Sequence, residues 1–285
     1  MKILSDLELK ERTSMKVGGP AGAFYEPEDE AELIECVSSA EKPWFLLGNG
    51  TNTVVRDSGY KGAVISTLKA LTGIEIKGLS LYSGAGESLA RICRYAVENG
   101  LSGLEELSGI PGTVGGAVYM NAGAYERDIA AVLSSVRAYD INDKNIIMLT
   151  VEECGFGYRN SVFKENELVI LSAEFTLAYG DKDTITGRMA EFTRLRNEKQ
   201  PVDMPSAGSF FKRPEGDFAG RLIEAAGMKG ASVGGAMVSV KHAGFIVNTG
   251  GATCADVLAL ASEVKAQVFE KFGVLLEEEP IVIGD

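Results

Sequence analysis

The feature that most constrains this chain is a glycine-rich stretch, GIPGTVGGAVYMNAGAY, at residues 109–125. Glycine loses more conformational freedom on folding than any other residue, so such a run marks unusual dihedrals or something pressed against the main chain. Gly112, Gly115 and Gly116 follow a proline where a helix would begin, with Thr113 among them. Close approach of a pyrophosphate or a flat ring would explain these glycines, and tight packing in a turn is the alternative.

A second glycine-rich segment, LLGNGTNTVVRD, precedes it at residues 46–57. A short buried strand runs there into a loop made of Gly48, Asn49, Gly50, Thr51 and Asn52. Successive N–H groups in such a loop can form a concave anion site, to which hydroxyl and amide groups add donors. The pattern is neither GxxxxGK[ST] nor GxGxxG, and an ordinary Asn-Gly turn is the alternative. One extended ligand could use both glycine-rich segments.

Two charged motifs lie further along the chain. The segment GYRNSVFK, residues 157–164, places Arg159 between a tyrosine and an asparagine, and a surface turn is the alternative interpretation. Near the C-terminus, LLEEEPIVIG contains three consecutive glutamates, which usually form a solvated face. The single histidine, His242, lies beside a strand-like run, where a structural role is the commoner one.

The segment KQPVDMPSAGSFFKRP, residues 199–214, combines hydroxyl groups with cations. Ser209 precedes two phenylalanines, which are followed by Lys212 and Arg213. These cations suit recognition of phosphate or carboxylate groups. A serine in this setting could act as a nucleophile with a base, or as a proton donor, and a solvated basic turn is the alternative.

Composition excludes several classes of function. The chain has 285 residues, 45% of them hydrophobic and 24% charged, which is enough for a sizeable core. A net charge of -12 argues against nucleic acid or an anionic membrane as the main partner, although a local basic pocket could still hold a phosphorylated small molecule. The cysteines are scattered and no metal site is expected. Without a disulfide framework, a signal peptide or a membrane-spanning run, we expect a cytoplasmic protein.

Helical and strand patterns alternate along the chain and predict an α+β protein with mixed sheets. The character changes near residue 180, where we place a domain boundary. Apolar spacing predicts helices over 28–40, 87–100, 181–201, 218–227 and 253–273. Thr253 is a plausible N-cap of the last helix and Gly273 a plausible stop. Strand-like runs are predicted at 42–50, 62–67, 134–141, 145–151, 168–180, 244–250 and 280–285.

Taken together and in this order, the motifs resemble the UDP-N-acetylenolpyruvoylglucosamine reductase family, flavoenzymes of peptidoglycan precursor synthesis. The resemblance covers nearly the whole chain. The segments that carry it are TSMKVGGPAGAFYEP, LGNGTNTVVRDSGYKGAVI, SGAGESLARICRYAVENGLSGLEELSGIPGTVGGAVYMNAGAY, CGFGYRNSVFK, RNEKQPVDMPSAGSFFKRP and GGAMVSVKHAGFIVNTGGAT. The spacing after residue 212 leaves little room for the inserted element of the longer type, so the chain is similar to the shorter type.

The resemblance implies an FAD-binding fold of the vanillyl-alcohol-oxidase-like (PCMH) type plus a smaller α+β substrate-binding domain. It places an FAD-binding domain at 1–180, with two α/β lobes that meet near residue 70, and a substrate-binding domain at 181–285. FAD would be bound non-covalently, with main-chain N–H groups of both glycine-rich segments at its pyrophosphate. The implied cofactor-binding residues are Gly48, Asn49, Gly50, Thr51, Asn52, Thr53, Gly112, Thr113, Gly115, Gly116, Asn121, Ala122 and Gly123.

The same resemblance implies the chemistry: NADPH reduces FAD, and the flavin then reduces UDP-N-acetylglucosamine enolpyruvate to UDP-N-acetylmuramate for cell-wall synthesis. Hydride would go from flavin N5 to C3, and a proton to C2. By motif, the catalytic residues are Arg159, Ser209 and Glu279, with Glu278 as a rival because the proline of the glutamate motif is shifted. Substrate would be bound by Tyr125, Lys199, Lys212 and Arg213, the last at a position that is often asparagine in the family.

Two other functions remain open at this point. A flavoprotein of the same fold could act as an alcohol or sugar oxidase, and reoxidation by oxygen would favour that interpretation. A flavin- or nucleotide-binding module without catalysis is a different class, against which the intact arginine, serine and glutamate motifs argue. We expect a monomer that acts on a small molecule and uses neither nucleic acid nor membrane.

Overall fold

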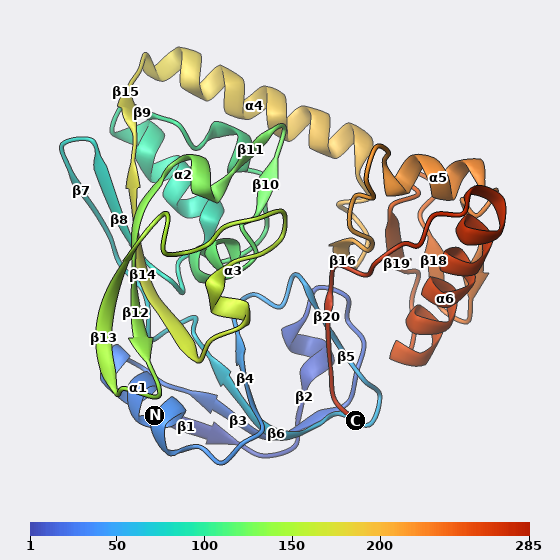
Figure 1. Ribbon diagram of the computed structural model, residues 1–285, viewed down its shortest axis with the longest axis horizontal. Helices are drawn as coiled ribbons and strands as arrows, with labels where there is room; N and C mark the ends of the chain where they lie inside the picture. Colours follow the sequence, from blue (N-terminus) through green and yellow to red (C-terminus); the bar gives the residue numbers. More distant parts are fainter. The chain divides into compact units, whose positions relative to one another are not determined.

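The computed structural model describes residues 1–285, which form two compact units (Figure 1). The units interleave along the chain: unit 1 comprises residues 1–3, 24–49 and 64–195, and unit 2 comprises residues 4–23, 50–63 and 196–285. Each unit has its own hydrophobic core. The chain passes between the units within strands β3 (Pro20–Glu26) and β6 (Tyr60–Ser66) and near the end of helix α4 (Lys182–Lys199).

Unit 1 is built on a five-stranded antiparallel sheet in the order β13-β12-β14-β8-β7. Alternate residues of the central strands, such as Val136 and Ala138, are fully buried, as expected for a sheet with one covered face. The strands of this sheet are β7 (Ile74–Lys77), β8 (Ser80–Gly84), β12 (Leu133–Asp140), β13 (Asn145–Thr150) and β14 (Leu168–Thr176).

Side-chain caps fix the first turn of two helices in unit 1. Helix α1 (Glu30–Ser39) is capped by the Asp29 carboxylate, which accepts a hydrogen bond from the Glu32 N–H. Helix α2 (Leu89–Glu98) buries one apolar stripe against the core. The short helix α3 (Val114–Tyr119) follows Thr113, whose hydroxyl accepts from the Gly116 N–H at 3.2 Å. A helix after Pro111 was expected from the sequence and is confirmed.

Small elements complete unit 1 and join it to the rest of the chain. A further sheet has the order β1-β3-β6-β4, with β2 beside β3, and two-stranded ribbons pair β10 with β11 and β9 with β15. These strands are β1 (Lys2–Leu4), β2 (Leu7–Glu8), β4 (Trp44–Leu47), β9 (Leu101–Ser102), β10 (Gly123–Ala124), β11 (Arg127–Asp128) and β15 (Ala178–Tyr179). The short 3-10 turns of unit 1 are η2 (Glu105–Leu107), η3 (Ile129–Ala131) and η4 (Val162–Lys164), whereas β2 and the 3-10 turn η1 (Leu9–Arg12) lie in unit 2.

Unit 2 combines a four-stranded antiparallel sheet, in the order β16-β19-β18-β17, with two helices. Helix α6 packs against β17, β18 and α5 (Figure 1). A separate pair joins β5 and β20 in parallel. The elements are β5 (Thr53–Val55), β16 (Ser206–Ser209), α5 (Ala219–Ala225), β17 (Ser232–Val233), β18 (Ala236–Val238), β19 (Phe245–Asn248), α6 (Cys254–Phe272) and β20 (Ile281–Ile283).

Both ends of α6 are fixed by their sequence. Thr253 and Asp256 form a capping box. The Asp57 carboxylate accepts from the N–H groups of Cys254 and Ala255, at 2.7 and 2.9 Å. Gly273 ends the helix in the left-handed conformation, at φ 68°, which glycine adopts without steric cost. The expected N-cap and stop are therefore both confirmed.

The domain boundary near residue 180 was expected from the change in sequence character and from the family resemblance. The structural division groups residues 4–23 and 50–63 with the C-terminal segment, and helix α4 begins just after residue 180 and continues to Lys199. The assignment of residues 1–180 to FAD and 181–285 to substrate stays a prediction. None of the helices combines the length and the apolar character that crossing a bilayer requires.

Candidate functional site

The two glycine-rich segments meet in unit 1. A Cβ atom built on Gly48 would lie 2.7 Å from the hydroxyl oxygen of Thr113 and 3.3 Å from its methyl carbon. Real Cβ atoms essentially never approach so closely, so glycine at position 48 permits this contact. The structure thus brings together the loop after β4 and the start of α3, as an extended ligand using both segments would require.

The first N–H groups of α3 already donate hydrogen bonds to acceptors within the chain. The N–H groups of Val114 and Gly115 donate to the carbonyl oxygens of Glu87 and Ala85, both at 2.8 Å, and that of Gly116 donates to the Thr113 hydroxyl. This network uses neither the N–H of Gly112 nor that of Thr113. Gly115 fits because a Cβ there would lie 2.9 Å from the Ala85 methyl. Packing against Ala85 therefore explains why residue 115 is glycine, and its N–H group is used within the chain.

Asn121 joins the second half of the glycine-rich stretch to the turn that carries Arg159. Its buried side-chain amide nitrogen donates to the Asp128 carboxylate at 3.0 Å and to the Gly157 carbonyl at 3.1 Å. Its amide oxygen accepts from the Ala130 N–H at 3.1 Å. The residue itself has φ 42°, in the left-handed region where asparagine is tolerated. Asn121 thus has protein partners at both polar atoms of its side chain.

The hairpin β10–β11 ends in a tight turn with uncommon residues. Ala124 pairs with Arg127, so Tyr125 and Glu126 are the two central residues, and their φ angles are 52° and 71°. Positive φ at both positions defines a type I′ turn, which normally takes asparagine or glycine. Each non-glycine residue held there costs about 1–2 kcal/mol. Backbone strain of this kind persists where surrounding contacts enforce it, as at many functional sites.

Tyr125 is held against helix α4 within unit 1. Its hydroxyl donates to the Phe192 carbonyl at 3.1 Å, and the two rings lie 4.6 Å apart at a tilt of 37°. The tyrosine remains 39% exposed. The structure therefore places the predicted substrate-binding tyrosine at the exposed tip of a hairpin, with one face of its ring on α4.

Arg159 lies in a turn closed by two reciprocal hydrogen bonds between Gly157 and Asn160, at 3.1 and 3.2 Å. Its φ of 53° is a left-handed conformation at the second central position, which favours glycine or asparagine. Its guanidinium donates to the Gly123 carbonyl at 3.4 Å and lies over the ring of Tyr158. These contacts place Arg159 beside the start of the Tyr125 hairpin.

Lys164 was not among the residues expected to act at the site. Its ammonium donates to the Arg159 carbonyl at 2.7 Å and lies 5.5 Å from the centre of the Tyr119 ring. The lysine therefore holds the main chain of Arg159 through its carbonyl oxygen. The only sequence signal was its presence in the same motif, five residues after the arginine.

In unit 2, Ser209 follows an irregularity in strand β16. The register against β19 shifts between Ser206 and Ser209, and Gly208 adopts φ 78° within the shift. Bulges of this kind often re-aim a side chain next to an active site. Ser209 is exposed, whereas the following Phe210 and Phe211 are buried in the core of unit 2. The bulge thus precedes the exposed Ser209, and the two phenylalanines directly after it anchor the strand in the core.

The glutamate motif lies directly beside this strand. The Glu279 N–H donates to the Phe210 carbonyl at 3.0 Å, and the Lys212 N–H donates to the Glu277 carbonyl at 2.8 Å. The amide of Asn52 donates to the Glu279 carbonyl at 3.3 Å. Unit 2 therefore brings together three regions that the sequence singled out separately: the 50–53 loop, the Ser209 strand and the glutamates.

The three consecutive glutamates have different surroundings. Glu277 pairs with the ammonium of Lys212 at 2.9 Å, and this hydrogen bond lowers the pKa of the Glu277 carboxyl. Glu278 pairs with Lys265 of α6 at 3.2 Å. Glu279 is the member whose main chain is tied to both Phe210 and Asn52. Because these contacts involve only the main chain of Glu279, the choice between Glu279 and Glu278 stays a prediction.

The remaining predicted residues are more dispersed. Lys199 is exposed at the last residue of α4, and the Arg213 guanidinium lies 3.9 Å from the centre of the Phe218 ring. His242 accepts from the Gly244 N–H at 3.1 Å, and burial lowers the pKa of its imidazole. Its contacts are with Gly220, Gly244 and Phe245 of its own unit, which fits the structural role that we expected. No cluster of residues with metal-ligand chemistry is present.

Comparison with known proteins gives the same assignment over the whole chain. Residues 200–283 match a model of the UDP-N-acetylenolpyruvoylglucosamine reductase C-terminal domain, and residues 21–147 match an FAD binding domain. A Clostridium botulinum protein named UDP-N-acetylenolpyruvoylglucosamine reductase is 45% identical, over 99% of this chain and 93% of its own length. The chain belongs to this reductase family.

Two further comparisons agree with this membership. The enzyme of the same name from Caldanaerobacter subterraneus is 44% identical and covers the whole chain and 94% of its own length. The crystal structure of UDP-N-acetylenolpyruvylglucosamine reductase from Thermus caldophilus superimposes with a TM-score of 0.83 at 38% identity, covering 99% of this chain and 98% of that one. The FAD-binding fold and the α+β class expected from the sequence are confirmed.

The residues present fit a flavin nucleotide. Asn49 and Gly116 are exposed close to the contact between Gly48 and Thr113, so an asparagine and a glycine are accessible where the two loops meet. Hydroxyl and amide groups of Thr51 and Asn52 continue the same loop. Such hydroxyl and amide donors suit the phosphate oxygens of a dinucleotide and its uncharged hydroxyl and carbonyl oxygens. FAD is accordingly the cofactor that this family member binds.

Proposed function

We propose that the protein catalyses the NADPH-dependent reduction of UDP-N-acetylglucosamine enolpyruvate to UDP-N-acetylmuramate, with non-covalent FAD. Membership of the family makes it an oxidoreductase and flavoprotein of peptidoglycan precursor synthesis. The observation that carries the finer proposal is the strained turn of Arg159. Arg159 has a left-handed backbone, its carbonyl accepts from Lys164, and its guanidinium donates to the Gly123 carbonyl. A cation positioned in this way supports the proposal that it binds an anionic group of the substrate.

In this proposal the two glycine-rich segments hold the cofactor. The donors would be the N–H groups of Gly112 and Thr113 and the loop of residues 48–53, whose side chains add hydroxyl and amide groups. Gly115, Gly116, Ala122 and Gly123 would line the flavin through bare or nearly bare main chain, while Asn121 fixes that main chain to the Arg159 turn. FAD, when bound, would supply the hydride that the substrate receives at C3.

The acid–base work falls to residues of this chain. Arg159 would bind the substrate carboxylate and stabilise the negative charge that develops on it as an enolate. Glu279, protonated or through a water molecule, would add a hydrogen bond to the same oxygens. Ser209 would give its hydroxyl proton to C2, and the strongly basic enolate would drive this transfer from a weakly acidic group.

Substrate phosphate and sugar groups would meet the cationic residues and the hairpin tip. Lys199, Lys212 and Arg213 supply positive charge on unit 2, and Tyr125 supplies an exposed ring on unit 1. The Arg213 guanidinium already lies over the ring of Phe218, a cation–π contact that holds it in place. Because NADPH and sugar nucleotides are cytoplasmic metabolites, the proposal places the enzyme in the cytoplasm, and we expect it to act as a monomer.

The experiment that tests the proposal follows the flavin band through two anaerobic half-reactions. NADPH should bleach the band of the wild-type protein, and the enolpyruvyl sugar nucleotide should restore it. Ser209→Ala should leave bleaching by NADPH near normal and slow the restoration by about 10²–10⁴-fold, the usual contribution of a positioned general acid.

Ser206→Ala is the matched control, because Ser206 lies in the same strand and its known contact uses only the main-chain carbonyl. This variant should behave as wild type in both half-reactions. Equal loss of both half-reactions in Ser209→Ala would refute the role of the serine. Restoration of the wild-type band by oxygen but not by the sugar nucleotide would instead favour a sugar or alcohol oxidase.

A further inference from the structure

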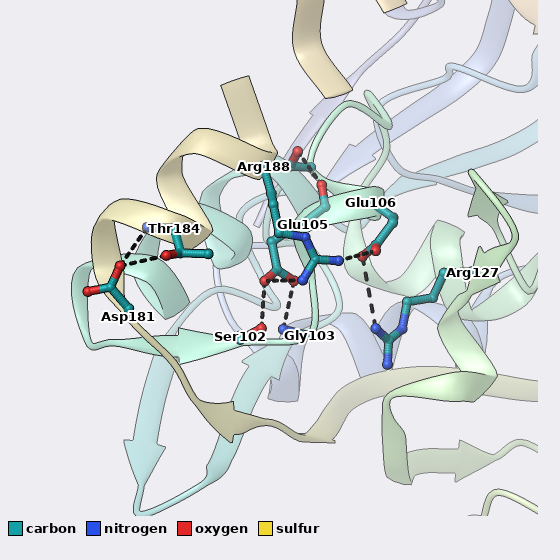
Figure 2. Close-up of polar contacts among 9 residues, drawn as sticks. Ser102, Gly103, Glu105, Glu106, Arg127, Asp181, Thr184 and Arg188 are labelled. Atoms are coloured by element: carbon teal, nitrogen blue, oxygen red, sulfur yellow. Dashed lines mark hydrogen bonds and ion pairs between the residues drawn. The ribbon is translucent and has the colours of Figure 1, made fainter. Parts of the chain in front are cut away.

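Two buried glutamates lie side by side in the turn η2 of unit 1, and only one of them is needed by that turn (Figure 2). Glu105 accepts from the Ser102 hydroxyl at 2.6 Å and from the Gly103 N–H at 2.7 Å. Burial alone would raise the pKa of Glu105, but these hydrogen bonds and the nearby Arg188 outweigh it and lower the pKa. Glu105 is thus an ionised residue that closes its own loop.

Glu106 makes no such local contact. One carboxylate oxygen accepts from the Arg188 guanidinium of α4 at 2.7 Å. The other oxygen has no hydrogen bond and lies 3.9 Å from the guanidinium of Arg127 in β11. The side chain of Glu106 is only 11% exposed, so these two arginines, rather than water, are the main partners of its carboxylate. Glu106 therefore connects helix α4 to the β10–β11 hairpin (Figure 2).

Helix α4 holds the same hairpin at a second point. Phe192 lies four residues after Arg188 and hence on the same face of the helix. Its carbonyl and ring contact Tyr125 at the hairpin tip, whereas Arg188 holds Glu106, which lies beside Arg127 of β11. The turn η2 also packs against both strands of the hairpin. The hairpin has only two pairs of residues, and so short a ribbon is marginal without such support.

We propose that Glu106 and Arg188 are positioning residues for the reaction. They fix the β10–β11 hairpin, and the Gly123 carbonyl at its start accepts from the Arg159 guanidinium at 3.4 Å. Displacing the hairpin would therefore misplace two groups at once, the Tyr125 ring and the Arg159 guanidinium. This inference rests on the proposed function, because it assigns the hairpin's position to the substrate half-reaction and not to reduction by NADPH.

The test uses the full-length flavin-loaded protein with three variants. Arg188→Met removes the guanidinium and keeps an apolar stem, Glu106→Gln removes the charge, and Arg188→Lys restores a cation at the same helix position. Arg137→Met is the matched control: Arg137 also pairs with a glutamate of unit 1, Glu30, at 2.6 Å, but from strand β12 to helix α1.

Two readouts are measured for each variant. The first is the pair of anaerobic flavin half-reactions, with NADPH and with UDP-N-acetylglucosamine enolpyruvate. We expect Arg188→Met and Glu106→Gln to slow reoxidation by the sugar nucleotide at least tenfold and to change reduction by NADPH less than twofold, with Arg188→Lys in between. The second is hydrogen exchange of main-chain amides in residues 121–130, which should accelerate at least tenfold in Arg188→Met and remain unchanged in Arg137→Met.

The outcomes separate this inference from the function on which it rests. Equal slowing of both half-reactions, or exchange in residues 121–130 that does not change, would overturn the positioning role. Slowing of reoxidation in Arg137→Met as large as that in Arg188→Met would also overturn it. A wild-type protein whose flavin is not restored by the sugar nucleotide would overturn the proposed function, and this inference with it.

Discussion

The contact between Gly48 and Thr113 allows a sharp test of how the two glycine-rich segments meet. The perturbation is Gly48→Ala, alone and together with Thr113→Ala. In the single variant the new methyl would lie 2.7 Å from the Thr113 hydroxyl oxygen, the same oxygen that caps α3. Because Thr113 is buried, it cannot move aside without giving up that cap.

The expected magnitudes follow from three contributions. Forcing a methyl group into a packed site costs about 1–3 kcal/mol. Loss of an N-cap costs about 1 kcal/mol. Replacing glycine by alanine returns about 0.4–1 kcal/mol by restricting the unfolded chain. Gly48→Ala should thus lower the free energy of unfolding by about 2 kcal/mol, and Thr113→Ala by about 1 kcal/mol.

The double variant shows whether the effects of the two substitutions depend on a direct contact between residues 48 and 113. Without the threonine hydroxyl and methyl groups, the nearest Thr113 atom to the new methyl is its Cβ at 3.6 Å, an ordinary contact. The double variant should therefore lose about 1 kcal/mol or less, which gives a coupling energy of about 2 kcal/mol in a double-mutant cycle. Urea unfolding followed by circular dichroism measures all four proteins. Strict additivity of the two substitutions would refute the contact between the loops.

Three other predictions concern charge and reactivity. Glu279→Gln should slow reoxidation of the flavin by substrate, whereas Glu278→Gln should leave it near wild type because the Glu278 carboxylate pairs with α6; stopped-flow absorbance distinguishes the two, and the reverse order would move the role to Glu278. The hydrogen bond from Arg221 lowers the pKa of Asp217 to about 2, so the stability that this pair contributes is present above the ordinary value of 3.8 and is lost as the pH falls towards 2. Carboxyl NMR titration checks this, and a midpoint near 3.8 would contradict it. All four cysteines are buried and free, and burial raises the pKa of Cys93 to about 12, so a thiol reagent at a pH of about 8 should label none before unfolding and all four after it.

The sequence predicted those parts of the fold that depend on local patterns. Helices α2 and α6 have clear apolar stripes, and the Thr253 cap and Gly273 stop of α6 are short-range signals. No element was expected in residues 74–84, where β7 and β8 form a hairpin of short strands. Strands of four or five residues carry too few alternations to stand out from a loop.

The candidate site was predictable only as a set of residue types. The motifs identified Arg159 and the two glycine-rich loops, but hydrogen bonds from Val114 and Gly115 to residues 85 and 87 depend on long-range pairing that no local pattern reveals. The same holds for Lys164, because its role follows from a carbonyl that it reaches across a turn. The left-handed conformations of Tyr125 and Glu126 run against local preference, and the contacts of Tyr125 with Phe192 are long-range ones that no local pattern reveals.

The parallel pairing of β5 with β20 has a consequence for how the chain is made. Val54 and Val55 are fully buried, yet their strand's partner is the last strand of the chain, with Thr53 opposite Ile281. During synthesis about 230 further residues must be added before that partner leaves the ribosome, which at about 5–20 residues per second takes on the order of 10–45 s.

For that interval the nascent chain presents an apolar strand edge with no native partner. Residues 4–23, which supply Met15 and Val17 to the same core, must wait equally long for the C-terminal helices. Unit 1 can complete its large antiparallel sheet from contiguous chain in the meantime. The order of folding is thereby set by the path of the chain: unit 2, whose segments 4–23 and 50–63 are made early, can close only after its C-terminal segment has been made.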